Sequence, residues 1–142
     1  MKKIFRIFSA ICMFPTLFIV WAFIILPGLF LGAIRFTGRQ EFLIARFVVN
    51  FKTRYKFCTK IINWWLNRYL GWAAPCAIII SPHALQDTIK HEIRHCKQIF
   101  LFGNLFYPLY GLFYLVCVII GKHSYYSNPF EKDARKNAGQ MY

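Results

Sequence analysis

Acidic side chains are scarce in this sequence. Its 142 residues contain five Asp plus Glu against 18 Lys plus Arg, which gives a net charge of +13. A site that needs a carboxylate therefore has few candidates, and four of the five acids lie between residues 87 and 133. Paired cysteines are also missing, because the five thiols include no C-x-x-C pair and their number is odd. This excludes a cysteine zinc site and gives no disulfide framework. The five are Cys12, Cys58, Cys76, Cys96 and Cys117.

Apolar residues are abundant. The chain is 58% hydrophobic and 20% aromatic, with a mean hydropathy of +0.41. Strong hydrophobicity combined with positive charge favours a protein in or on an anionic membrane surface. A nucleic-acid-binding protein would share the charge but would rarely need this much aliphatic surface. Membrane lipids are therefore the expected partner, and nucleic acid is not.

Residues 7–34 form an uncharged run of 28 residues, longer than the roughly 20 that cross a bilayer. Residues 1–38 are therefore expected to be a membrane anchor, either a kinked span or a re-entrant hairpin. A cleaved signal peptide fits less well, since no A-x-A site follows. The heavier basic cluster lies after the run, so the body is expected on the cytoplasmic side of the inner membrane. Four helix-disrupting residues interrupt the run, at Pro15, Pro27, Gly28 and Gly32.

Residues 39–72 lack proline, and their first glycine comes at Gly71. Apolar side chains recur there at steps of three or four, with basic residues between them and Trp64, Trp65 and Trp72 near the end. This pattern predicts a basic, aromatic, amphipathic helix at the membrane interface. A core helix with one solvated basic side is the alternative.

The segment AAPCAIII, residues 73–80, is apolar and ends in three β-branched residues, so it predicts a strand. Ser81 and Pro82 then end that strand and open a turn or helix. A second apolar run follows at residues 99–121, between two lysines, and it is long enough to be a transmembrane helix.

The motif HEIRH lies at residues 91–95, between the strand and the second apolar run. On a helix, His91 and His95 lie one turn apart on one face and can bind one metal ion, with Glu92 placed to polarise a bound water. Gln98 continues the polar stripe. An apolar stripe of Leu85, Ile89, Ile93, Cys96 and Phe100 predicts the packing face. The alternative places two histidines on a solvated helix face, without a metal.

A zinc site of this kind needs a third protein ligand. Asn128 and Pro129 predict a helix start, which places Glu131 on the first turn. Glu131 can face the metal or bond its own N-cap amide in a capping box, and local evidence leaves the two equal. A single bilayer crossing by residues 99–121 would separate Glu131 from the histidines. A complete site therefore requires a break at Gly103-Asn104 or Pro108, with a return helix over residues 105–120.

HEIRHCKQ, an apolar stretch and then YYSNPFEKDAR resemble a family of small bacterial zinc metallopeptidases of minimal gluzincin type. That family carries H-E-x-x-H-x-x-Q followed by N-P-x-E-x-x-A, and the resemblance covers roughly residues 74–138. It implies His91, His95 and Glu131 as zinc ligands and Glu92 as the general base. The chain departs from the family in leaving little room for a substrate cleft.

Several neighbours of Glu131 are candidates for supporting roles. Tyr125, Tyr126 and His123 are candidates for steadying an oxyanion, although packing or interface roles fit each of them too. Asp133 can orient a ligand histidine or pair with Arg135 or Lys136.

The sequence thus predicts a mainly α, membrane-associated protein. Its third part, residues 73–142, would be a minimal zincin-like α+β unit with a short strand, the HEIRH helix, a return helix and a glutamate helix. The expected function is a membrane-anchored zinc metallopeptidase that hydrolyses peptide bonds, with a peptide or protein substrate near the membrane. A non-catalytic membrane protein with a structural or vestigial metal site is the first alternative. A basic surface protein in which HEIRH is accidental is the second.

Overall fold

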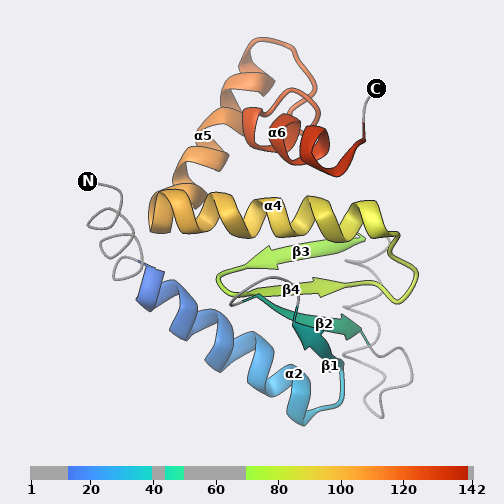
Figure 1. Ribbon diagram of the computed structural model, residues 1–142. Coiled ribbons are helices and arrows are strands. Elements are labelled where there is room, and N and C mark those ends of the chain that lie inside the picture. Colours follow the sequence, from blue (N-terminus) through green and yellow to red (C-terminus); the bar gives the residue numbers. More distant parts are fainter. Residues whose placement is uncertain (1–12, 40–43, 50–69, 141–142) are drawn as a thin grey trace.

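The computed structural model describes residues 13–39, 44–49 and 70–140, and it shows a mixed fold of helices and one four-stranded sheet (Figure 1). The strand order is β1-β2-β4-β3. β2 and β4 are parallel, whereas the two outer pairs are antiparallel. The strands are β1 (Ile34–Arg39), β2 (Ala45–Val49), β3 (Gly71–Ala74) and β4 (Ala77–Ile80). The expected mainly helical fold therefore holds only in part.

The helix predicted over residues 39–72 is wrong at Ala45–Val49, which form β2, and at its two ends, where Arg39 belongs to β1 and residues 71–72 belong to β3. Phe47 and Val49 alternate with half-buried neighbours and are themselves buried, which is the period of a strand. Hydrogen bonding to β1 on one side and β4 on the other stabilises this strand. These partners lie elsewhere in the chain, so local spacing did not reveal them. Residues 40–43 and 50–69 of the predicted helix lie outside the described residues.

The single strand predicted over residues 73–80 is a hairpin of β3 and β4. Pro75 and Cys76 form its two-residue turn, where Cys76 has a positive φ of 60°. Proline fixes the φ that the first central turn position needs, so Pro75 marks the reversal inside an otherwise uniform apolar run. The predicted turn after Ser81 is confirmed, and the Ser81 hydroxyl accepts a hydrogen bond from the His83 amide there.

Both faces of the sheet are covered. Helix Met13–Phe30 packs on one face through residues such as Val20 and Ile25, which share a core with Phe47 and Ile79. Helix α4 (Gln86–Phe102) lies across β3 and β4 on the other face (Figure 1). Burial on both faces explains why β4 is apolar at every position.

Helix Met13–Phe30 contains a π-helical stretch, η1 (Trp21–Ile25), directly before α2 (Leu26–Phe30). The amide of Leu26 bonds the carbonyl of Trp21, five residues back. Pro27 has no amide hydrogen, so the regular bonding ladder cannot continue through it, and the preceding turn widens. In the described part of the uncharged run, residues 13–30 form one helix, and a turn then leads into β1. The choice between a kinked span and a re-entrant hairpin stays a prediction.

The predicted break after the HEIRH helix is confirmed. Helix α4 ends at Phe102, where Gly103 adopts a positive φ of 59°. The turn η2 (Gly103–Leu105) then leads into α5 (Phe106–Ile119). Pro108 stands in the first turn of α5, where a missing amide hydrogen costs little. Figure 1 shows α5 leaving the end of α4 steeply rather than lying along it, so the expected close return by this helix does not occur.

Helix α6 (Pro129–Ala138) brings the chain back to α4. Its predicted start is confirmed, because the Asn128 side chain accepts a hydrogen bond from the Phe130 amide at 3.0 Å and Pro129 opens the first turn. The helix ends at Gly139, which adopts the left-handed conformation. Phe130 anchors α6 in the core that α4 shares with the sheet.

Two helical stretches of the described residues are long and apolar enough to cross a membrane by length and composition, namely Met13–Phe30 and the broken run Gln86–Ile119. Many of their large apolar side chains point outward, including Phe18 and Phe23 on the first and Leu115 and Ile119 on α5. The division of the chain at residues 38 and 72 stays a prediction.

Candidate metal centre

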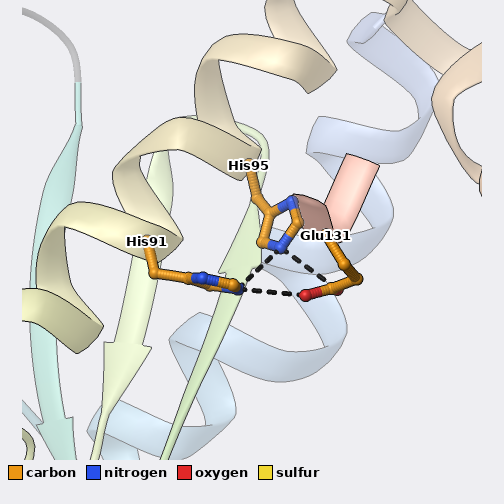
Figure 2. A group of neighbouring side chains, drawn as sticks. All are labelled: His91, His95 and Glu131. Carbon is orange, nitrogen blue, oxygen red and sulfur yellow. Dashed lines mark hydrogen bonds and ion pairs between the residues drawn. The ribbon is translucent and has the colours of Figure 1, made fainter. Parts of the chain in front are cut away.

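His91 and His95 lie one turn apart on α4 and point toward each other, as Figure 2 shows. Their Nε2 atoms are 3.0 Å apart, and both residues are buried, with exposed fractions of 6% and 7%. The alternative of two histidines on a solvated helix face is therefore wrong. The apolar stripe on the same helix is largely as predicted, except that Leu85 is exposed because it is the N-cap residue before the first turn.

Glu131 reaches the two histidines from the first turn of α6 (Figure 2). Its Oε2 is 3.2 Å from His91 Nε2, and its Oε1 is 3.2 Å from His95 Nε2. The capping-box alternative does not form, because the Asn128 amide donates to the Tyr125 carbonyl instead. The predicted meeting of these three residues, two from α4 and one from α6, is thus confirmed.

The three residues fit a metal ion. One donor atom from each lies within 4.8 Å of the others, and all three residues are buried. Of two facing imidazole Nε2 atoms, one can carry a proton and donate it to the lone pair of the other. A cation between them can instead bind the lone pairs of both atoms. Glu131 Oε2 is buried with no hydrogen-bond donor among the described residues. Two nitrogens and one carboxylate oxygen suit a divalent transition-metal ion.

Glu131 is held in its charged form. Burial opposes ionisation, but the imidazoles of His91 and His95, each 3.2 Å from a Glu131 oxygen, outweigh burial and keep the pKa of Glu131 well below its usual range. The Tyr110 hydroxyl on α5 donates a further bond to Glu131 Oε1 at 2.8 Å. Sequence reasoning missed Tyr110, because an aromatic residue in an apolar run carries no local signal of this contact.

Glu92 lines the same cavity as the three metal-capable residues. That cavity has a volume of about 340 Å³. Its walls come from β3, α4, α5 and the segment before α6, and they include Gly71, Tyr107, Tyr110 and Tyr125. Burial raises the pKa of Glu92, which favours its protonated form relative to a solvated glutamate.

The lack of a side chain at Gly71 leaves room for the Glu92 side chain. A Cβ at residue 71 would lie 2.7 Å from Glu92 Cγ and 2.8 Å from Glu92 Oε1. The carboxylate therefore lies against the backbone of edge strand β3. Nothing in the local sequence around Gly71 pointed to this contact.

The three candidates for steadying an oxyanion lie at different places. Tyr125 lines the cavity and interacts with Glu131, and burial together with that negative charge raises its pKa, so its hydroxyl stays protonated. His123 and Tyr126 instead line a neighbouring cavity of about 630 Å³, which Glu92 and His91 also border. The Arg135 guanidinium lies 5.2 Å and 4.8 Å from the ring centres of Tyr125 and Tyr126, and it packs against both.

Asp133 contacts neither histidine directly. It accepts two hydrogen bonds from Arg94 and one from the Gln98 amide, and Gln98 in turn bonds His95. The predicted alternative of pairing with Arg135 or Lys136 is replaced by pairing with Arg94 on α4. Bonds from Arg94 hold the pKa of Asp133 below its usual value.

Three comparisons with known proteins gave no match. No family model matches the sequence, no curated protein matches it, and no solved structure matches the fold.

Proposed function

We propose that this protein is a membrane-associated, zinc-dependent peptidase. The observation that carries the proposal is the buried cluster of His91, His95 and Glu131, with Glu92 beside it on the wall of a shared cavity. Two histidines and a glutamate with an open fourth position are a common ligand set of catalytic zinc. When bound there, zinc would lower the pKa of a coordinated water and polarise a peptide carbonyl.

Glu92 is the residue proposed to move the proton. It stands next to a ligand histidine, and its carboxylate is held against β3 on one side. In this role it accepts a proton from the attacking water and returns it to the leaving amine. Its burial supports the role, because a carboxylate with a raised pKa is a stronger base than a solvated one.

Tyr125 is the side chain proposed to steady the developing negative charge on the substrate oxygen. It borders the cavity, and its protonated hydroxyl can donate a hydrogen bond. His123 and Tyr126 would act on more distant parts of a substrate, since they border only the second cavity.

The proposed membrane association rests on exposed apolar surface and charge. Phe14, Phe18 and Phe23 on helix Met13–Phe30 are each more than half exposed, which is costly in water. A net charge of +13 adds attraction to anionic lipid headgroups. A peptide or protein substrate close to the membrane, with the C-terminal body on the cytoplasmic side, is part of the proposal.

The alternative is a non-catalytic membrane protein in which the cluster holds a structural metal. Deep burial of all three metal-capable residues favours it, since structural sites are closed to solvent. The two functions differ in what Glu92 does, because a structural site needs its ligands and not a general base.

Glu92→Gln tests the proposal. Protein purified in detergent and protein in anionic vesicles would be assayed for zinc content by elemental mass spectrometry and for cleavage of a mixture of quenched fluorescent peptides. We expect about one zinc per chain in both the unaltered protein and the variant. We expect cleavage by the variant to be lower by about 10²–10⁴-fold. The His91→Ala variant should lose both cleavage and the bound zinc.

The other possible outcomes distinguish between the two functions or contradict both. Bound zinc with no cleavage by the unaltered protein, in detergent or in vesicles, would favour the structural alternative. Equal cleavage by the Glu92→Gln variant would remove Glu92 from the mechanism. Failure to retain zinc would overturn both functions.

A further inference from the structure

The side-chain amide of Gln98 lies between the two helices that carry the metal-capable residues. Its Oε1 is 2.8 Å from His95 Nδ1 on α4. Its Nε2 donates to the Phe130 carbonyl at 3.0 Å and to Asp133 Oδ2 at 2.7 Å, both on α6. The oxygen of the amide and both of its N–H groups are thus hydrogen-bonded, and Gln98 is only 5% exposed.

The partners on α6 fix which way round the amide lies. A backbone carbonyl and a carboxylate can only accept hydrogen bonds, so the NH₂ group must face both of them. A flipped amide would place its oxygen against two acceptors and lose both bonds. The Gln98 oxygen must therefore face His95, which requires a proton on His95 Nδ1.

A proton on Nδ1 leaves the lone pair of a neutral imidazole on Nε2. That is the atom which points toward His91 and Glu131 (Figure 2). We propose that Gln98 is a positioning residue that holds His95 in its Nδ1-protonated, metal-binding tautomer, and that Asp133 sets the orientation of Gln98. This inference rests on the metal centre in the proposed function, but it does not depend on peptide hydrolysis.

Arg94 completes the arrangement from the α4 side. Its guanidinium donates to both oxygens of Asp133, at 2.7 Å and 3.0 Å. This bidentate pair fixes the carboxylate in place, and because both of its oxygens accept from Arg94, Asp133 faces Gln98 as an acceptor. The same amide also bonds the backbone immediately before Glu131, so one side chain positions ligands from two helices.

The experiment compares Gln98→Leu, Gln98→Glu and Asp133→Asn in the full chain, with Asp87→Asn as the matched control. Asp87 is an exposed acid on α4 whose partner is Lys90, away from the centre. Zinc affinity would be measured by chelator competition, and the protonated ring nitrogen of His95 by NMR of histidine-labelled protein. The tautomer of His95 reports the proposed role directly, because a loss of packing alone would not change it.

We expect Gln98→Leu to weaken zinc binding about 10–100-fold and to lower the fraction of His95 that carries a proton on Nδ1. Gln98→Glu keeps an acceptor for His95 but faces Asp133 with like charge, so combining it with Asp133→Asn should restore much of the affinity. Asp133→Asn alone should weaken binding less than Gln98→Leu, because Phe130 still orients the amide. Asp87→Asn should change neither quantity.

A Gln98→Leu protein with an unchanged His95 tautomer and zinc affinity within twofold of the unaltered chain would overturn the inference. An affinity loss in Gln98→Leu without a tautomer change would also overturn it, since that result indicates packing alone. If the tautomer and affinity follow expectation while no peptide is cleaved, the positioning role stands and the peptidase function fails.

Discussion

Gly71→Ala should displace the proposed general base without touching a metal-capable residue. The new Cβ would lie 2.7 Å from Glu92 Cγ, whereas ordinary contacts begin at 3.4 Å, so the two groups must separate by about 0.7 Å. Misplacing a catalytic group by about 1 Å can cost about 10²-fold in rate. We therefore expect kcat for peptide cleavage to fall between tenfold and a hundredfold, while zinc content stays at the level of the unaltered protein.

The same substitution should lower the free energy of unfolding by no more than about 2.5 kcal/mol. Alanine in a strand is favoured over glycine by about 0.5–1 kcal/mol, and crowding against Glu92 opposes this with about 1–3 kcal/mol. Gly111→Ala on α5 is the matched control, because nothing lies within 4 Å of the position that its Cβ would take. A Gly71→Ala protein with full kcat, or one that loses zinc, would refute the reasoning.

Three further results are expected. Tyr110→Phe removes the hydroxyl that bonds Glu131 at 2.8 Å, so chelator competition should show zinc affinity lowered about fivefold, as expected for about 1 kcal/mol, and an unchanged affinity would contradict this. Because the pKa of Glu131 is lower when folded than its ordinary 4.5, the metal-free protein should be stabilised above pH 4.5 and lose this as pH falls below it. The melting temperature should therefore fall less steeply on acidification in Glu131→Gln than in the unaltered protein. Equal slopes would count against the ion pairs between Glu131 and the two histidines. Phe23, which is 72% exposed, should contact lipid, so Phe23→Asn should reduce flotation with anionic vesicles, unlike Gln86→Asn at the exposed start of α4.

The parts of the fold that sequence could predict depend on short-range rules. The spacing of His91 and His95, the break at Gly103 and the Asn128-Pro129 helix start are each decided within a few residues. The residues around Glu131 left its metal-ligand and capping-box roles equal, and the resemblance of NPFEKDAR to a metallopeptidase motif was what favoured the ligand role. The histidine pair was therefore within reach of local reasoning, whereas the third residue was not.

The parts that sequence could not predict depend on pairing between distant segments. Strand β2 is a strand because β1 and β4 lie on either side of it, and its own residues also fit a helical spacing. Tyr110, Gly71 and Gln98 became meaningful only through contacts with α6, Glu92 and Asp133. No pattern within a window of ten residues contains that information.

The hydrogen bond between Thr16 and Asn104 joins the beginning of helix Met13–Phe30 to the turn that ends α4. If that helix lies in lipid, its depth sets the height of everything attached to α4. His95 stands seven residues before Phe102, which is about 10 Å along the helix axis. Under the proposed peptidase function, the distance of a peptide bond from the bilayer would then restrict cleavage as much as the residues around that bond.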